Sequence, residues 1–571
     1  MADTTGLSPF IFPIEGGLVL NNSSFTLKPG SALELENYEP DPLGGYRRIN
    51  GYTKWASAPV PITNSTTEPV LMSAVYLGEV VASRGESVYR STDASSSVSG
   101  TLADAATTVT VTSTTGFSTT GTLLIGSEQI TYTGLTTTTF TGCTRGTNST
   151  TAASHSDTTP VNQTWTSIDS GRTSAQKYTF RRINFQGTEL LAFADGSNNA
   201  SYWNGSTVTD VNGTNAPADP HYISVFKNTG FYAGMSSNPQ EIIFTAPLTL
   251  DDFSVANGAG SFVVDSPVTG IVVFRDSLFI FSANRIYKLT GSSQADYQLT
   301  PVTREIGCRN GWTIKEFAGD IIFLGPDGLR TIAGTAKIGD VDLGTISKPI
   351  QELFQNKTDV ADFDAVVIPN KTQYRIIFGK NGKAASSTNG VICARKEEGY
   401  EFSTLKGLSI SCSDSEVYQG SFYIVHGDYD GYVYRDETGN TFDGTPIIGR
   451  YRSPDIIAGD AGIRKAFQRV IINYAPEGNV EADLLLRYDY EDNTSPRPLA
   501  YPFDTSKVAA LYGTDNALYG SVTYGGQSDP LIRQPVEGSG FSVALRVVDT
   551  GVSAPYSLKG FQLEFTTAAR R

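Results

Sequence analysis

Short apolar runs separated by polar turns repeat along most of the chain. Residues 270–281 and 317–324 each contain two apolar runs joined by a short polar turn, at Arg275-Asp276 and Gly319-Asp320. Each pair is followed by a second turn and a third apolar run. This order predicts antiparallel hairpins, each extended by a third strand.

The same unit recurs in weaker form over several hundred residues. Copies occupy residues 74–89 and 182–196, and further copies begin at Ile223, Ala365 and Val417. From residue 183 onward the copies start 40 to 52 residues apart. A period of about 40–50 residues built from short strands is typical of propeller blades. No WD or kelch consensus is present, so a series of unrelated hairpins in β-sandwiches is the alternative interpretation.

One interval breaks this period. The 108 residues from Val75 to Ile183 span more than two repeats, and the excess, residues 94–162, is rich in Thr. Strict alternation in the run TVTVT at 108–112 predicts half-buried strands. We expect a small β domain at 94–162, inserted in a loop of the first blade, because a loop tip tolerates a compact insertion best.

The two ends of the chain have longer alternating strands. Residues 469–474, 482–490, 540–547 and 559–565 suit a β-sandwich with one solvated face. The N-terminal region is also strand-like, so we expect both ends to pack together.

The predicted fold is therefore all-β. It comprises a β-propeller at 70–439 and a β-sandwich-like platform from both termini, at 1–69 and 440–571, together with the inserted domain. One short helix is expected at 347–354, with Ser347 as its N-cap and Pro349 in its first turn.

Composition agrees with this picture and narrows the function. The 571 residues include 57 Gly, and 39% are hydrophobic against 18% charged, as in a globular protein with few helices. The net charge of −15 disfavours a protein that reads nucleic-acid sequence, which needs a basic surface. The sequence shows neither a secretory signal nor an apolar run of about 18 residues, so no membrane span is expected.

Motifs for catalysis, metal binding or cofactor binding are weak or missing. The three histidines form no HExxH motif, and no nucleophile elbow or phosphate-binding loop occurs. His426 is expected to be structural. Asp428 and Asp430 suggest calcium, but the EF-hand spacing fails, so a plain turn is preferred. We expect no enzyme activity, no metal and no cofactor, although paired carboxylates for glycoside hydrolysis are invisible to sequence reasoning.

The four cysteines carry no zinc-binding spacing. A disulfide between Cys393 and Cys412 is one alternative, and free buried thiols are preferred.

Three segments give the chain a family resemblance. The first is PGSALELENYEPDPLGGYRRINGY at 29–52. The second comprises DSLFIF at 276–281, IYKLTG at 286–291, VTREIGC at 302–308, FLGPDGL at 323–329 and GDV at 339–341. The third comprises GDYDGYV at 427–433 and TFDGTP at 441–446. With these segments the chain resembles the tail nozzle (tail tubular protein B-like) family of short-tailed bacteriophages.

The resemblance implies a structural protein of the virion tail. Six copies would form a ring below the adaptor (head-to-tail connector) protein and extend a tube for DNA ejection, with tail fibre or needle proteins attached. DNA would pass through the lumen without sequence-specific binding. The Thr-rich insertion resembles a small module of many phage structural proteins, and it departs from the simplest layout of the family.

The acidic composition suits such a tube, because Lys and Arg side chains that neutralise phosphates are what grip DNA. We therefore expect a net-negative lumen. Ring interfaces are expected on the platform strands, with Gly44, Gly45 and Tyr46 as candidates at a tight interface turn; ordinary turn chemistry is the alternative. Two other function classes stay open: a receptor- or glycan-binding propeller, and a tail-spike-like polysaccharide depolymerase.

Overall fold

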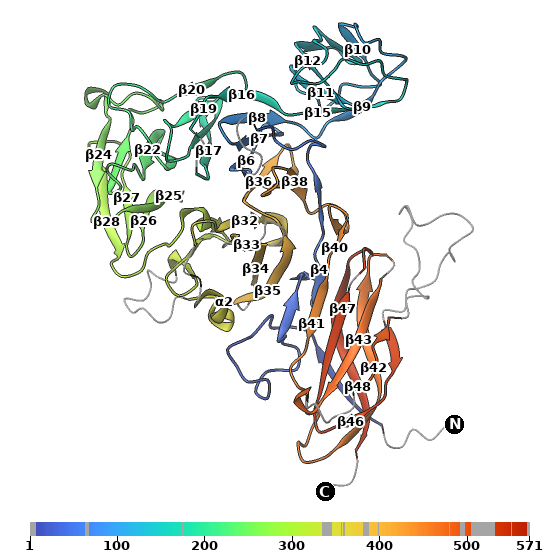
Figure 1. Cartoon of the computed structure of the whole chain (residues 1–571). Helices are drawn as coiled ribbons and strands as arrows, with labels where there is room; N and C mark the ends of the chain where they lie inside the picture. Colours follow the sequence, from blue (N-terminus) through green and yellow to red (C-terminus); the bar gives the residue numbers. More distant parts are fainter. Residues whose placement is uncertain are drawn as a thin grey trace.

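The structure, a computed structural model, is built almost wholly of β-strands that form a ring of sheets, a sandwich and a small outlying unit (Figure 1). It describes residues 7–62, 68–173, 176–333, 345–355, 357, 360–380, 388–397, 399–478, 480–491, 497–503, 531–549 and 551–567. The predicted all-β fold, with a propeller, a platform from both termini and an inserted domain, is confirmed. The GDV segment at 339–341 lies outside the described residues.

Seven blades surround the propeller axis, and in each the strands are antiparallel and follow one another outward from the axis. Blades 1 to 4 have four strands each. Blade 1 contains β6 (Met72–Tyr76), β7 (Glu79–Arg84), β8 (Ser87–Ser91) and β16 (Thr166–Ser170), and blade 2 contains β17 (Thr179–Phe185), β18 (Thr188–Ala194), β19 (Ser201–Trp203) and β20 (Val208–Asp210). Blade 3 contains β21 (Tyr222–Phe226), β22 (Thr229–Ala233), β23 (Glu241–Phe244) and β24 (Gly260–Val263), and blade 4 contains β25 (Val268–Phe274), β26 (Ser277–Ser282), β27 (Ile286–Thr290) and β28 (Gln298–Thr303).

Blades 5 to 7 complete the ring. Blade 5 contains β29 (Lys315–Phe317), β30 (Asp320–Leu324) and β31 (Leu329–Thr331). Blade 6 contains β32 (Asp364–Ile368), β33 (Gln373–Phe378), β34 (Thr388–Lys396) and β35 (Gly399–Leu408), and blade 7 contains β36 (Cys412–Tyr418), β37 (Ser421–Gly427), β38 (Val433–Asp436) and β5 (Tyr52–Lys54). The short β39 (Thr441–Phe442) and β40 (Thr445–Pro446) extend blade 7. The seven repeat copies of the sequence analysis fall one in each blade, at or beside its innermost strand.

The ring is closed by a strand from the other end of the propeller sequence. Strand β5 pairs with β38 through Tyr434↔Lys54, Arg435↔Thr53 and Asp436↔Tyr52. Blade 7 therefore takes its fourth strand from a segment almost 400 residues earlier. Such pairing fixes the two ends of the propeller together, because opening the ring would break backbone hydrogen bonds as well as apolar packing.

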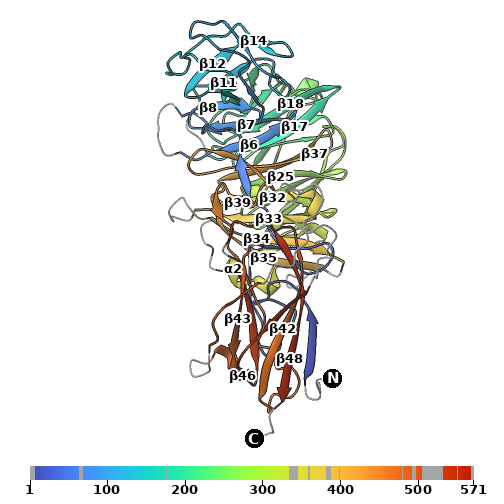
Figure 2. The same ribbon diagram turned by 90° about the vertical axis from the view of Figure 1, so that its right-hand side faces the viewer.

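The inserted domain lies between β8 and β16, at the outer edge of blade 1 and away from the axis (Figures 1 and 2). It has a four-stranded sheet and a three-stranded sheet around its own apolar core. Their strands are β9 (Ser95–Ser97), β11 (Gly121–Ile125), β12 (Glu128–Tyr132) and β15 (Pro160–Thr164); and β10 (Thr108–Thr110), β13 (Gly134–Leu135) and β14 (Thr139–Thr141).

The platform is a sandwich of two sheets at the opposite end of the molecule from the insertion, and it holds both ends of the described chain (Figure 2). One sheet contains β1 (Ser8–Pro13), β3 (Tyr38–Pro40), β4 (Tyr46–Arg48), β42 (Lys465–Pro476), β45 (Leu531–Pro535), β46 (Ser539–Gly540) and β48 (Tyr556–Thr567). The other contains β2 (Glu34–Glu36), β41 (Gly449–Arg452), β43 (Ala482–Tyr488), β44 (Tyr501–Pro502) and β47 (Val543–Asp549).

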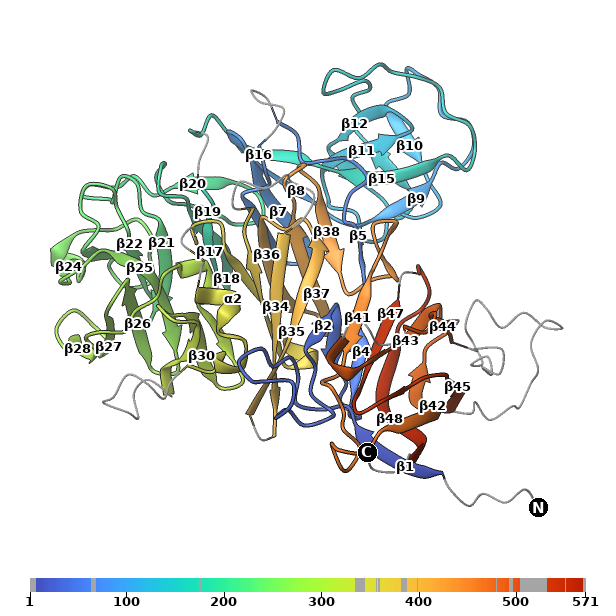
Figure 3. The same ribbon diagram turned by 60° about the horizontal axis from the view of Figure 1, so that its bottom comes forward.

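A continuous sheet joins the platform to the propeller. Strand β2 pairs in parallel with β35 of blade 6 and antiparallel with β41, so one nine-stranded sheet runs from β32 to β44 (Figure 3). The buried Asn37 reinforces the joint, since its amide donates to the carbonyls of Lys406 and Ile448 at 3.1 and 2.9 Å. The backbone of Asn37 has φ of 58°, a left-handed conformation that Asn tolerates better than most residues.

Helix is confined to short turns in the described part of the chain: α2 (Glu352–Gln355) and single 3-10 turns at Val255–Asn257, Gly311–Thr313, Lys348–Ile350, Pro369–Lys371 and Asp489–Glu491. The expected helix at 347–354 is a 3-10 turn followed by α2. Ser347 does not cap it through its side chain, which instead accepts a hydrogen bond from the Leu329 amide at 2.9 Å. The preference for free buried thiols is confirmed for all four cysteines, and no described helix has the length and apolar character to cross a membrane.

Candidate functional site

The predicted interface turn joins β3 to β4 in the platform. The Gly44 and Gly45 backbones have φ of 88° and 79°, in the left-handed region that Gly adopts without steric penalty. A Cβ on Gly45 would lie 2.0 Å from the Leu558 carbonyl oxygen, whereas one on Gly44 would meet nothing within 4 Å. Gly45 is therefore required by the close approach of β48, and Gly44 only by its backbone conformation.

Tyr46 points into the platform rather than away from it. Its ring is buried, and its hydroxyl donates to Glu401 Oε2 at 2.9 Å and accepts from the Gly17 amide at 2.5 Å. Tyr46 thus ties β4 to blade 6. The residue of this turn that projects outward is Leu43, whose side chain is 89% exposed. Whether the turn contacts another subunit stays a prediction.

The outer surface of the platform carries further apolar groups. Ile11 on β1 is 69% exposed and lines a groove of about 440 Å³ with Ile471 of β42 and Phe561 of β48. Strand β1 pairs only with β48, so its other edge has no strand partner among the described residues. An apolar groove beside a free strand edge is suited to association with another chain.

A buried ion pair fastens the two chain ends inside the platform. Arg48 of β4 and Asp549 of β47 are both buried, and Arg48 Nη1 lies 3.0 Å from Asp549 Oδ2. Arg48 also donates to the Ser553 carbonyl. Burial raises the pKa of Asp549 to about 6, although the Arg48 charge acts in the opposite direction. The carboxylate is therefore held in its charged form mainly by Arg48.

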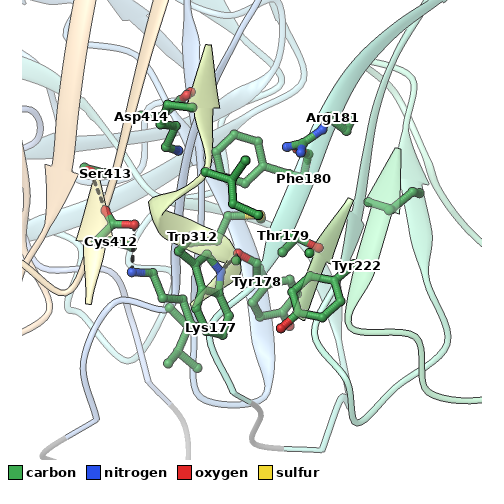
Figure 4. Close-up of a pocket in the computed structure, with 18 of the residues that line it drawn as sticks. Lys177, Tyr178, Thr179, Phe180, Arg181, Tyr222, Trp312, Cys412, Ser413 and Asp414 are labelled. Carbon is green, nitrogen blue, oxygen red and sulfur yellow. Dashed lines mark hydrogen bonds and ion pairs between the residues drawn. The ribbon is translucent and has the colours of Figure 1, made fainter. Parts of the chain in front are cut away.

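The second candidate region is the channel on the propeller axis, shown in Figure 4. Its inner part has a volume of about 140 Å³ and is lined by residues at or beside the innermost strand of every blade. A wider outer part, of about 530 Å³, opens beyond Lys177 and Trp312, which line both parts. The outer part is flanked by His221 and Tyr429.

Charged side chains gather in the inner channel. Lys177 Nζ lies 2.8 Å from Asp364 Oδ1. Arg182 pairs with Asp414 and, at 2.8 Å, with Glu416. These contacts join blade 2 to blades 6 and 7 across the ring closure, because Arg182 belongs to β17 and both of its partners belong to β36.

Two further cations in the channel have no carboxylate partner among the described residues. Arg181 donates only to two carbonyls, of Phe180 at 2.8 Å and of Ile271 at 3.2 Å. The ammonium group of Lys315, at the start of β29, forms no hydrogen bond or ion pair within the described chain. Burial, and next the neighbouring Arg182, lower the pKa of Arg181 to about 10, and burial also lowers the pKa of Lys315.

The residues singled out by sequence for chemistry have structural roles. His426 is buried, with Nδ1 2.8 Å from Asp436 Oδ1 and its ring stacked on Tyr434. Asp428 Oδ1 accepts from the amides of Asp430 and Tyr432, at 3.0 and 2.7 Å, which makes the expected Asp-Gly turn.

The channel cations were not found from sequence. Arg181, Arg182 and Lys315 each stand next to one apolar residue (Phe180, Ile183 and Ile314), which gives them no common role in the sequence. Their common signal is position: Arg181 and Arg182 stand at the start of the repeat copy at 182–196, and Lys315 lies two residues before the copy at 317–324. These positions line one cavity only because the seven blades close into a ring around it.

Comparisons with known proteins find similarity to solved structures alone. No family model matches the chain, and no curated protein matches it. Among solved structures, it is similar to Kluyveromyces lactis Hsv2, with 10% identity, 59% of this chain and 98% of that one covered, and a TM-score of 0.28. The WD40 β-propeller domain of Doa1 gives 13% identity, coverage of 68% and 97%, and a TM-score of 0.25. An ancestral GH74 enzyme gives 9% identity, coverage of 70% and 53%, and a TM-score of 0.27. The propeller assignment rests on the strand pairing of this chain itself.

Proposed function

We propose that the chain is a structural subunit of the tail nozzle of a short-tailed bacteriophage. Six copies would form a ring below the adaptor protein and extend the tube through which DNA leaves. The family resemblance of the segments at 29–52, 276–329 and 427–446 is the sequence basis of this proposal. Tail fibre or needle proteins would be further partners, and the protein would act as a scaffold without catalysis.

The observation that carries the proposal is the way the platform is built. Strands from both chain ends interleave in one sheet, where β48 pairs with β1, β4 and β42. The second sheet continues into blade 6 without interruption. Backbone pairing across such a joint resists hinge motion, because bending it would break ladder hydrogen bonds. A tube wall that must keep its diameter while DNA passes would use that rigidity.

The ring contacts are assigned to the outer surface of the platform. The free edge of β1 with Ile11, the groove beside it and the exposed Leu43 provide apolar area on neighbouring strands. A closed ring of identical subunits needs a heterologous contact, in which one surface meets a different surface of the next copy. The β1 edge is one half of that contact in the proposed ring.

Mass photometry of the purified chain, alone and mixed with its adaptor protein, tests the proposal. We expect assemblies of six times 61.2 kDa, either free or on the adaptor. Ile11→Asp should prevent them, because a charge would enter an apolar contact. Val263→Asp is the matched control, since Val263 is also 69% exposed but lies on β24 of blade 3, in the propeller.

The opposite result is equally clear. A chain that stays monomeric in both mixtures, and binds or cleaves cell-surface polysaccharide, would contradict the nozzle. Binding alone would favour a receptor- or glycan-binding propeller, and cleavage would favour a depolymerase. Assembly that is unaffected by Ile11→Asp would keep the ring but move its interface away from β1.

A further inference from the structure

The inner channel of the propeller holds more positive than negative charge, in a protein whose net charge is −15. Four cations line it: Lys177, Arg181, Arg182 and Lys315. Two carboxylates line it, those of Asp364 and Asp414, and both are already engaged in ion pairs. The third carboxylate in reach, Glu416, also pairs with Arg182. Arg181 and Lys315 are left over.

We propose that the propeller axis binds a small oxyanion of the phosphate class between Lys315 and Arg181. This site is independent of the nozzle function proposed above, and it would exist in a monomer as well as in a ring.

The free hydrogen-bond donors point to an anion. An ammonium has three donors, and none of those of Lys315 is used within the described chain. A guanidinium has five, and Arg181 places donors on two carbonyls, which leaves the others for a ligand. Both side chains are partly exposed and line the channel, so these donors are open to a ligand that enters it.

The two cations also lack charge compensation. The charges of Asp364 and Asp414 favour the charged form of Lys315, but both carboxylates lie beyond ion-pair distance of it and pair with other cations. The Arg181 charge disfavours the charged form of Lys315, and the Arg182 charge disfavours that of Arg181. A bound anion would relieve both effects, because it supplies negative charge where the protein supplies none.

Size and donor geometry favour phosphate over other anions. A volume of about 140 Å³ is roughly ten times the 10–15 Å³ that one water requires, so it admits a small ion with some water and excludes a polymer. A planar guanidinium binds two oxygens of a phosphate at once, and a lysine adds a point charge. A tetrahedral dianion can accept from both side chains and balance both charges.

The ion has a route into the site. The outer part of the channel is wider and meets the inner part at Lys177 and Trp312. Lys177 Nζ lies 5.4 Å from the centre of the Trp312 ring and pairs with Asp364, so it is held at the entrance. The outer part, with its aromatic groups His221 and Tyr429, has room for the organic part of a phosphate ester.

Titration calorimetry of the purified chain with inorganic phosphate tests the site. We expect measurable binding that weakens about tenfold or more in Lys315→Met, because a charged hydrogen bond is lost. Lys227→Met is the control: Lys227 pairs with Asp276 at an exposed turn of the propeller and should leave affinity unchanged. A parallel titration with ribose 5-phosphate distinguishes the source: equal affinity indicates the free ion, and tighter binding indicates an ester whose organic part occupies the outer channel.

Loss of phosphate binding in Lys315→Met can be separated from a loss of folding. Lys315→Met removes a side chain with no hydrogen bond in the described structure, so the ligand-free variant should unfold at the same or a higher temperature than the wild type. A tungstate soak gives a second readout, with a metal peak expected between Lys315 and Arg181 and absent in the variant. The site is refuted if phosphate does not bind at millimolar concentration, if Lys315→Met binds it as tightly as the wild type, or if tungstate binds elsewhere.

Discussion

Breaking the buried Arg48–Asp549 pair should loosen the platform while the propeller stays intact. Arg48→Met leaves Asp549 buried without its counter-charge, and it also removes the hydrogen bond to the Ser553 carbonyl. Removal of one partner of a buried ion pair costs about 3–5 kcal/mol. At about 1.4 kcal/mol per factor of ten, platform amides that exchange by opening of β47 and β48 should exchange roughly 10²- to 4 × 10³-fold faster.

Hydrogen exchange read by mass spectrometry is the suitable assay. All four Trp residues, at 55, 165, 203 and 312, lie outside the platform, so tryptophan fluorescence would miss the event. Peptides from β47 and β48 report the platform, and peptides from β26 serve as the internal reference. Arg469→Met is the matched control, because Arg469 pairs with Glu564 on the same sheet but is 45% exposed. Exposed pairs contribute about 0–1 kcal/mol, so exchange should change less than about fivefold.

The loss of platform stability in Arg48→Met should depend on pH. The folded pKa of Asp549, about 6, lies above the ordinary aspartate value of 3.8, so the folded state binds the proton more tightly than the unfolded state. The free-energy cost of burying the charged Asp549 carboxylate is fully present above the folded pKa, and it disappears as the pH falls toward 3.8. Without Arg48 the folded pKa rises further, so the loss in Arg48→Met should be smaller at pH 5 than at pH 7.5.

A double variant completes the argument. Arg48→Met with Asp549→Asn removes both charges and should restore more than half of the lost protection, because no unpaired charge remains. The reasoning is refuted if Arg48→Met and Arg469→Met behave alike, or if the double variant is as unstable as the sum of the single variants.

Three other predictions concern the turn, the insertion and the lumen. Gly45→Ala should destabilise the platform severely, because its Cβ would meet the Leu558 carbonyl, whereas Gly44→Ala should cost only about 1–2 kcal/mol; equal thermal shifts of the two variants would contradict the turn geometry. Glu128→Gln should unfold the insertion selectively in hydrogen exchange, since buried Glu128 holds Arg145 at 2.7 Å and His155 at 2.8 Å. Burial opposes the charged form of Glu128, but these partners lower its pKa to about 2. The wild-type insertion should therefore lose stability as the pH falls from about 4.5 to 2. Full protection of its amides from exchange at pH 2.5 would refute the role of Glu128. A map of the ring should show a net-negative lumen, and a wall dominated by Lys and Arg would contradict passage of DNA through a lumen that does not grip it.

Local pattern was enough to predict the blades. The hairpin from β25 to β26, with its turn at Arg275-Asp276, is set by neighbouring residues, and the pairing Phe274↔Ser277 is the one that alternation predicts. The Thr-rich insertion was likewise visible, because its composition and the broken period coincide. Such features need no knowledge of residues distant in the sequence.

Long-range pairing set the limit of sequence reasoning. Residues 52–54 were assigned to the platform segment, yet β5 completes blade 7, because its partner β38 follows almost 400 residues later. Tyr46 is a candidate for an interface turn by sequence, while in the structure its side chain is buried and hydrogen-bonded to Glu401 of blade 6. The pairing of Arg182 with Asp414 crosses 232 positions, and no local signal reveals it.

Electron microscopy of the purified chain together with its adaptor protein tests the central proposal most directly. We expect closed six-fold rings, coaxial with the adaptor, in which the platforms are in mutual contact and each propeller keeps its seven blades. Single particles that leave the adaptor bare, or rings held together without the platform, would contradict it.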